Sequence, residues 1–162
     1  MPTSVPGPPI EGAELRPAVA TDAPELLVLQ RCCWVDEAIA NDTLDIAALH
    51  ESLDDVRAWL DEWSAWCVRI DGRLVGAVRA IRLGDAWEIG RLMVAPDLSG
   101  RGLGRWLLQL AEAQAPAGVV RIELFTGANS TRNIRMYQQA GYELTGAPAP
   151  ANAVKLAKRW DG

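Results

Sequence analysis

Residues Trp87–Ala115 read Trp-Glu-Ile-Gly-Arg-Leu-Met-Val-Ala-Pro-Asp-Leu-Ser-Gly-Arg-Gly-Leu-Gly-Arg-Trp-Leu-Leu-Gln-Leu-Ala-Glu-Ala-Gln-Ala. The apolar run Trp87–Val94 predicts a strand, which the proline two residues later ends. Further along, Leu103, Leu107 and Leu110 fall on one face of a predicted helix, an apolar stripe suited to lie on a sheet. A glycine-rich turn joins the two. This strand–turn–helix unit is the centre around which the rest of the chain is organised.

The turn carries Gly100, Gly102 and Gly104 interleaved with Arg101 and Arg105. Such a turn presents free backbone N–H groups at the positive end of a helix, which is typical of an anion site and here predicts a pyrophosphate site. The dinucleotide fingerprint G-x-G-x-x-G fails, because starting at Gly100 it requires glycine where Arg105 stands. The P-loop pattern fails as well, because no Lys-Ser or Lys-Thr pair lies nearby. These failures disfavour a nucleotide-binding enzyme.

The same unit resembles the pyrophosphate loop of the GNAT acyltransferase superfamily, whose pattern is Q/R-x-x-G-x-G/A after a strand of the form L-x-V-x-P. Leu92, Val94 and Pro96 match that strand, and Gly102 and Gly104 match the loop. Ser99 stands at the Gln/Arg position, so its side chain is expected to contribute less there. A purely structural turn is the alternative interpretation of the glycines.

A second pattern near the C-terminus supports the resemblance. Ser130, Asn133, Tyr137, Gly141 and Tyr142 are spaced as in the family's N-x-x-A-x-x-x-Y-x-x-x-G-F signature, with Ser and Asn at the first two marked places. The resemblance implies an α+β (α/β) fold: a mixed, mostly antiparallel twisted sheet of about seven strands flanked by four helices, with a splayed parallel strand pair at its centre.

The resemblance also implies acetyl-coenzyme A as co-substrate, an amine as acceptor, and no metal. Main-chain groups of the central strand would pair with the pantetheine arm, the glycine turn would hold the pyrophosphate, and the late signature would bond the far side of the cofactor. The residues implied are Leu92, Met93, Val94, Gly100, Arg101, Gly102, Leu103, Gly104, Arg105, Ser130 and Asn133. For Asn133 the alternative is a helix first-turn residue that satisfies local backbone groups.

Direct transfer needs a neutral amine, whereas an alkyl ammonium has a pKa near ~10, and a carboxylate that takes the proton, directly or through one water, would provide it. Glu88, on the central strand, is the first candidate, and Glu123, on the next parallel strand, is the second. Either could instead be a solvated residue or an ion-pair partner of a nearby arginine. Tyr137 matches the family position for a phenol that protonates the leaving thiolate, with a purely structural core tyrosine as the alternative.

The composition bounds the setting of this chemistry. The 162 residues are 49% hydrophobic and carry a net charge of −5, which argues against a nucleic-acid binder. No apolar run approaches a membrane span of roughly 20 residues. Three cysteines without a C-x-x-C pattern suggest neither disulfides nor zinc, so a cytoplasmic location is expected. We expect a disordered proline-rich tail over residues 1–12 and one acetyltransferase domain over residues 13–160.

The acidic charge is concentrated between Asp36 and Glu62, where nine acids stand against Arg57 alone. In the family's fold this segment flanks the acceptor side of the cleft, so it favours a cationic acceptor, with a solvated helix face as the alternative. We therefore predict an N-acetyltransferase, and the competing hypothesis is a non-catalytic acyl-coenzyme A binding module. The expected partners are acetyl-coenzyme A and an amine acceptor, and a homodimer remains an open alternative to a monomer.

Overall fold

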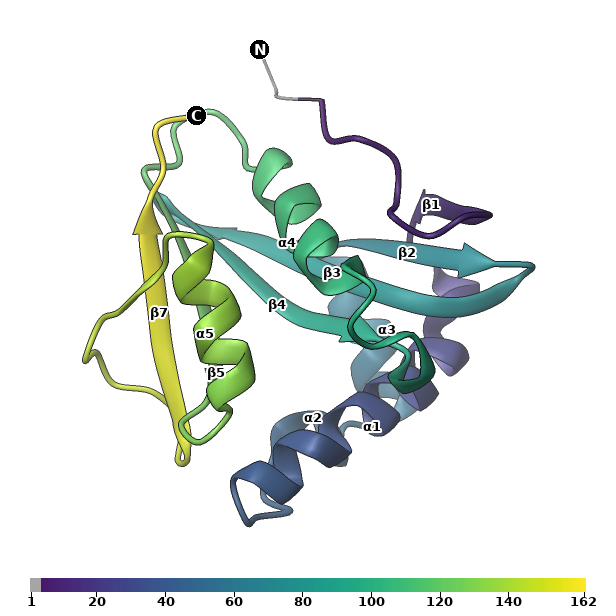
Figure 1. Ribbon diagram of the computed structural model, residues 1–162, viewed down its shortest axis with the longest axis horizontal. Coiled ribbons are helices and arrows are strands. Elements are labelled where there is room, and N and C mark those ends of the chain that lie inside the picture. The colour runs from purple at the N-terminus through teal and green to yellow at the C-terminus, as the bar shows by residue number, and fades with distance from the viewer. Residues whose placement is uncertain (1–3) are drawn as a thin grey trace.

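The computed structural model describes residues 4–162, and its centre is a seven-stranded mixed sheet (Figure 1). The strands lie in the order β1-β2-β3-β4-β5-β7-β6, and every neighbouring pair is antiparallel except β4 and β5. Their bounds are β1 Ala13–Pro17, β2 Ser64–Ile70, β3 Arg73–Leu83, β4 Ala86–Val94, β5 Arg121–Gly127, β6 Glu143–Leu144 and β7 Ala153–Arg159. The predicted mixed sheet with a central parallel pair is confirmed.

Helices cover both faces of this sheet (Figure 1). The early helices α1, α2 and α3 pack together on one face, and α4 lies against β3 and β4 on the other, with α5 beside it. Their bounds are α1 Ala23–Ala40, α2 Ala47–His50, α3 Leu53–Glu62, α4 Leu103–Ala113 and α5 Thr131–Gln139, with short 3-10 turns at Ala20–Asp22 and Pro96–Leu98. Ser52 caps the start of α3, where its hydroxyl accepts a hydrogen bond from the backbone N–H of Asp55.

Helix α4 lies on the sheet through its leucine stripe. Leu103, Leu107 and Leu110 are all buried, as their spacing predicts. Gly76 of β3 lies directly beneath them, and a Cβ there would come within 3.2 Å of both Leu103 and Leu107. The missing side chain lets helix and sheet approach closely, which fixes the start of α4 relative to β4.

The central parallel pair separates soon after it begins. Strands β4 and β5 pair only at Ala86–Arg121, Trp87–Ile122 and Glu88–Glu123, although both strands continue beyond these residues. A bulge in β4 accompanies the separation, with Arg91 at a φ of 45° in the left-handed region. The backbone edges beyond Glu88 therefore face a gap between the strands instead of a ladder.

The segment predicted as a disordered N-terminal tail contacts the rest of the chain at Pro6 and Ile10. Pro6 accepts a hydrogen bond of 2.7 Å on its carbonyl from the Trp106 indole, and Ile10 is buried in the core. The composition of this segment favours disorder, but a proline-rich segment can lie extended over a helix when an apolar anchor and an indole donor hold it. The first three residues of the predicted tail, 1–3, lie outside the described part of the chain.

Candidate active site

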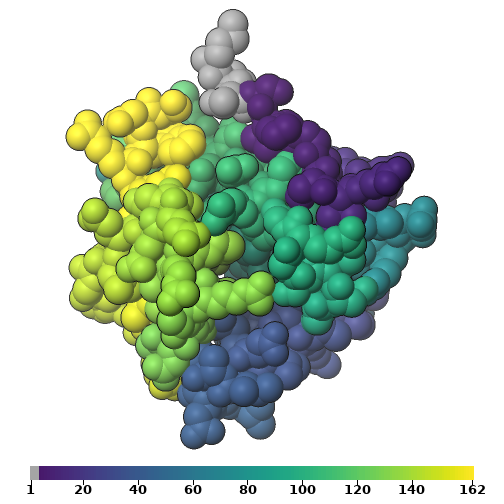
Figure 2. Space-filling view, viewed as in Figure 1, coloured from purple at the N-terminus to yellow at the C-terminus, as the bar shows by residue number. Residues whose placement is uncertain are grey.

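A cavity of about 1000 Å³ occupies the gap between β4 and β5. Its walls come from α1 and α2 on one side and from α5 on the other, and it extends to the turn before α4. The face in Figure 2 is hollowed between the yellow-green C-terminal segment and the earlier parts of the chain. The cavity thus runs from the glycine turn to the point where the parallel strands separate.

The glycine turn ends in unpaired backbone donors. Gly100 and Gly102 have φ of 79° and 85°, a left-handed conformation that favours glycine. Helix α4 begins at Leu103 with no side-chain cap. Within residues 4–162, no hydrogen bond uses the backbone N–H groups of residues 100–105. Free N–H groups at the start of an eleven-residue helix form an anion site.

Most of the residues predicted for this turn line the cavity: Gly100, Gly102, Leu103, Gly104 and Arg105. Arg101 does not line it and is exposed to solvent. The Arg105 guanidinium donates to the Gln139 side-chain oxygen at 2.8 Å, which places it over the space between α4 and α5. The charge predicted from two arginines is therefore represented in the cavity by Arg105 alone.

The exposed edge of β4 forms the floor of the cavity beyond the turn. Leu92 and Val94 line it, whereas the Met93 side chain is buried in the core. The Cys33 thiol on α1 donates to the Val94 carbonyl at 3.1 Å. Burial raises the pKa of Cys33 to about 11, so the thiol stays protonated and can donate. Sequence reasoning gave no role to Cys33, because no local pattern links it to a strand 61 residues away.

The two carboxylate candidates lie opposite each other at the last paired position of β4 and β5, in contrasting environments. Glu88 lines the cavity, and burial raises its pKa. Glu123 does not line the cavity and forms ion pairs with Arg121 at 2.6 Å and Lys155 at 3.0 Å. Burial of Glu123 would raise its pKa, but the hydrogen bonds from those two bases outweigh it and lower the pKa. Environments that separate two carboxyl pKa values in this way are typical of an acid–base site.

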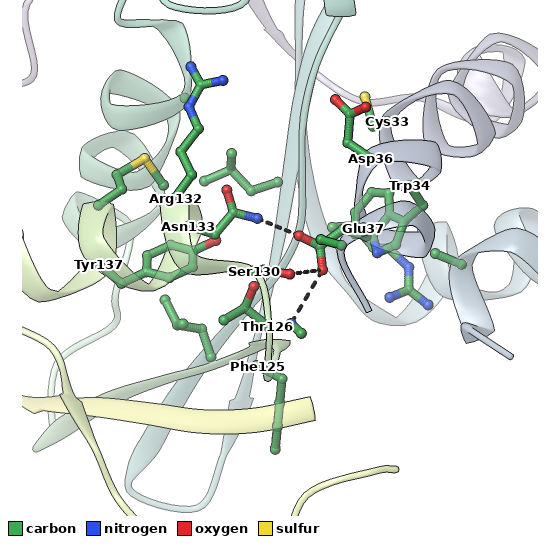
Figure 3. A pocket seen from close by; sticks show the side chains of 18 of the residues that line it. Cys33, Trp34, Asp36, Glu37, Phe125, Thr126, Ser130, Arg132, Asn133 and Tyr137 are labelled. Atoms are coloured by element: carbon green, nitrogen blue, oxygen red, sulfur yellow. Dashed lines mark hydrogen bonds between the residues drawn. The ribbon is translucent and has the colours of Figure 1, made fainter. Parts of the chain in front are cut away.

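Tyr137 of α5 also lines the cavity, as Figure 3 shows. It is 8% exposed, and its hydroxyl has no hydrogen-bond partner within residues 4–162. Burial, together with the negative charge of Glu37, raises the pKa of Tyr137, so the phenol remains protonated. An unpartnered phenol at a cavity wall can donate a proton to a bound group.

Ser130 and Asn133 contact α1 across the cavity. Glu37 accepts from the Ser130 hydroxyl at 2.7 Å and from the Asn133 amide at 2.6 Å (Figure 3). Asn41 adds a bond to Ser130 at 3.0 Å, and a Cβ on Gly127 would lie 2.3 Å from its amide nitrogen. Sequence reasoning missed Glu37 and Asn41. The only available signal was the acidic run, and nothing in it identifies which acid faces α5.

Besides Glu37, two other acids of the run Asp36–Glu62 line the cavity, and so do two nearby tryptophans. Asp36 and Asp45 line the cavity together with Trp34 and Trp63, whereas Trp59 is buried in the core.

Within residues 4–162, no group of three or more His, Cys, Asp or Glu side chains is arranged to hold a metal. None of the helices in that part of the chain is long and apolar enough to cross a bilayer.

Comparisons with known proteins agree with this architecture. The PaiA N-acetyltransferase of Thermoplasma acidophilum, solved in complex with coenzyme A, is 13% identical with a TM-score of 0.75, over 91% of this chain and 99% of that one. An acetyltransferase from Streptococcus agalactiae is 20% identical with a TM-score of 0.76, over 93% and 100%. At these identities the likeness concerns the fold.

The UPF0157 protein YqkA of Bacillus subtilis is 31% identical over 124 residues, which are 76% of this chain and 35% of that protein. The chain therefore matches about a third of this curated relative's length. The sequence pattern of the acetyltransferase (GNAT) family matches residues 25–142, most of the chain. The chain belongs to the acetyltransferase (GNAT) family.

Proposed function

We propose that this protein transfers an acetyl group from acetyl-coenzyme A to a primary amine. The observation that carries the proposal is one continuous cavity with free helix N–H groups at one end and Glu88 at the other. The family match and the coenzyme A complex of the Thermoplasma neighbour support the choice of cofactor. Acetyl-coenzyme A would supply an activated acetyl group. Its thioester C–S bond breaks as a C–N bond to the amine forms.

The residues of the cavity fit coenzyme A. The unpaired N–H groups of residues 100–105 would bind the diphosphate, and the Arg105 guanidinium would add charge. Backbone groups of Leu92 and Val94, on an edge that has no strand partner, would bind the amides of the pantetheine arm. We leave Ser130 and Asn133 out of this set, because Glu37 engages their polar groups.

Glu88 is the proposed general base. A base works best when its pKa lies near the working pH, and burial moves the pKa of Glu88 upward in that direction. Glu88 would take the proton from the acceptor's ammonium and leave a neutral amine. Glu123 is proposed as a structural anion instead, since Arg121 and Lys155 hold it ionised and away from the cavity.

Tyr137 is the proposed general acid. Its protonated hydroxyl would donate to the thiolate sulfur that the transfer leaves behind. The ammonium loses two protons in the transfer: one to Glu88 before the attack, and one from the attacking nitrogen, which passes through water to the Tyr137 phenolate once Tyr137 has protonated the thiolate. The net result is one proton released to solvent from Glu88. Solvent exchange restores both side chains for the next turnover.

Thiol release from acetyl-coenzyme A, followed across a panel of primary amines, tests the proposal. We expect amine-dependent release in the parent chain, strong loss in Glu88→Gln and Tyr137→Phe, and much smaller loss in Glu123→Gln. Calorimetry with coenzyme A runs in parallel. Tight binding without amine-dependent release would indicate a non-catalytic binding module, and absence of coenzyme A binding would contradict the proposal as a whole.

A further inference from the structure

Arg79 lines the cavity near Glu88 as a cation with no anionic partner. It projects from β3 toward α3, where its guanidinium lies 4.0 Å from the ring centre of Trp63 and 4.8 Å from that of Trp59. Its Nε atom is buried without a hydrogen-bond partner, and within residues 4–162 the side chain makes no hydrogen bond or ion pair. The two indole rings hold the guanidinium in place but do not neutralise it.

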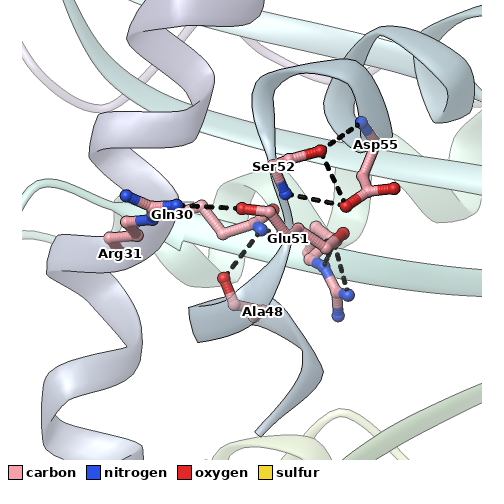
Figure 4. Close-up of polar contacts among 7 residues, drawn as sticks. Gln30, Arg31, Ala48, Glu51, Ser52 and Asp55 are labelled. Carbon is pink, nitrogen blue, oxygen red and sulfur yellow. Dashed lines mark hydrogen bonds and ion pairs between the residues drawn. The ribbon is translucent and has the colours of Figure 1, made fainter.

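Glu51, which follows α2, is a neighbouring carboxylate, but it is already paired with another arginine. Glu51 binds Arg91 through Nη2 at 2.8 Å and Nε at 3.1 Å, and it accepts from the Gln30 amide at 3.2 Å. Figure 4 shows Glu51 held among these contacts beside the capped start of α3. Burial and the charge of Arg91 lower the pKa of Arg79 to about 10, so its guanidinium is still charged at neutral pH. The charges of Glu51 and Glu88 compensate this half-buried guanidinium only at a distance, and a bound anion in direct contact would relieve the remaining cost of its burial.

The register of β3 and β4 places Arg79 and Glu88 on the same face of the sheet. Arg79 pairs with Gly90, and Glu88 lies two residues along β4, which makes the two charged residues diagonal neighbours about 7–8 Å apart at Cα. They form no ion pair with each other within the described residues. An open cation and an open anion therefore face the same part of the cavity.

Gly90 leaves space between these charges. A Cβ at this position would lie 3.6 Å from the Arg79 Nε and 3.7 Å from the Trp63 ring. The absent side chain therefore leaves a niche at Gly90 that the guanidinium and the indole border. Gly90 itself lines the cavity. A larger side chain there would cover Arg79, and its absence keeps the guanidinium accessible from the cavity.

We infer that the acceptor is an amino acid or a similar small amine that carries a carboxylate beside its amino group. The carboxylate binds Arg79 in the niche at Gly90, and the amino group lies toward Glu88. A planar guanidinium suits a carboxylate through paired hydrogen bonds, and stacking on Trp63 fixes its plane. This inference rests on the proposed function, and it narrows the acceptor class from primary amines in general to zwitterions.

Matched acceptor pairs test the inference directly. L-leucine is compared with isopentylamine, L-phenylalanine with phenethylamine, and L-lysine with cadaverine, so that each pair differs by one carboxylate. We expect kcat/KM to favour the amino acid by at least about tenfold in one or more pairs, as a paired charge-assisted bond requires. Calorimetry of each compound with the coenzyme A-saturated protein is expected to show the same order in Kd.

Substitutions locate the effect. Arg79→Met is expected to abolish the preference for the amino acid, so that kcat/KM falls more for the amino acid than for its amine partner. The readout is the ratio of the two kcat/KM values, because the charge of Arg79 also acts on the pKa of Glu88 and with it on turnover of both compounds. Gly90→Val is expected to weaken amino-acid binding by filling the niche. Arg82→Met serves as the matched control, because Arg82 lies on the same strand but is exposed and bonds to loop carbonyls. Arg79→Lys, which keeps the charge without the planar fork, is expected to recover only part of the preference.

The outcomes separate this inference from the proposed function. Thiol release with the plain amines and no preference for the amino acids overturns the zwitterion inference and leaves the acetyltransferase intact. If no compound supports thiol release, calorimetry still decides: amino-acid binding that Arg79→Met removes supports the inference, and absence of binding overturns it. Should Arg79→Met fail to fold, the acid-to-amine comparison on the parent chain decides the question by itself.

Discussion

Replacing Gly102 with alanine tests the geometry of the anion site. Gly102 has a φ of 85°, and the nearest atom to an added Cβ would be Pro9 Cγ at 3.9 Å, so the methyl group itself fits. The cost is backbone strain, about 1–2 kcal/mol for an L-residue in the left-handed region. Relief of that strain would turn the N–H groups of the loop. Because a hydrogen bond to a charged group contributes about 1.5–3 kcal/mol, misaligning one predicts a loss of coenzyme A affinity of about ten- to a hundredfold.

Two other glycines provide controls for this substitution. Gly84, in the β3–β4 turn, has a φ of 63° and open space around it, so Gly84→Ala should lose similar stability and keep its coenzyme A affinity. Gly104 lies within α4, and an added Cβ would make ordinary 3.7 Å contacts with Leu92 and Val94, so Gly104→Ala should fold at least as well as the parent. Urea denaturation measures the stability and calorimetry the affinity. Parent-like binding by a destabilised Gly102→Ala would refute the reasoning.

Four further substitutions, with Asp36→Asn as a control, probe the carboxylates and the phenol in and beside the cavity. Glu88→Gln should reduce thiol release about a hundred- to ten-thousandfold. Because burial raises the pKa of Glu88, the parent loses stability as pH rises through that pKa, so urea denaturation should find the Gln variant more stable at neutral pH and equal at low pH. Glu123→Gln should behave in the opposite way, because basic neighbours lower the pKa of Glu123. The parent should therefore have the larger free energy of unfolding at neutral pH, and the difference should disappear as the solution is acidified. Tyr137→Phe should lower kcat in steady-state assays with little change in stability, since its hydroxyl bonds to nothing within residues 4–162. Glu37→Gln should lose about 2 kcal/mol of unfolding free energy, because it weakens charge-assisted bonds. Asp36→Asn, next to it at the cavity wall but solvent-exposed and without a hydrogen bond within residues 4–162, should lose almost none. Equal losses would contradict the assigned contacts.

Local patterns made much of the fold predictable. The leucine spacing that predicts α4 depends on residues close together in sequence, and it is confirmed. The serine cap of α3 is equally local, because Ser52 and Asp55 are three residues apart. The glycine turn was equally readable, because left-handed backbone and free helix N–H groups follow from residue type and position. Composition gives no sign of the contacts at the N-terminus, where Ile10 and the carbonyl of Pro6 find partners far along the chain.

The choice between the carboxylates required the tertiary structure. Glu88 and Glu123 have similar sequence surroundings, but only the pairing of β5 with β7 brings Lys155 to Glu123. The Glu37–Asn133 contact spans 96 positions, and no spacing rule connects such distant residues. Arg79 carries no signal in the sequence for the same reason, because its isolation becomes visible only when Glu51 is seen to bind Arg91 instead.

The most direct measurement of the central claim is an amide chemical-shift titration of the ¹⁵N-labelled protein with coenzyme A and, separately, with pantetheine. Coenzyme A should produce the largest shifts at the N–H groups of residues 100–105, and pantetheine, which lacks the diphosphate, should leave those groups unmoved while shifting residues of β4. Equal shifts at residues 100–105 with both compounds, or none with coenzyme A, would contradict the assignment of this turn as the diphosphate site.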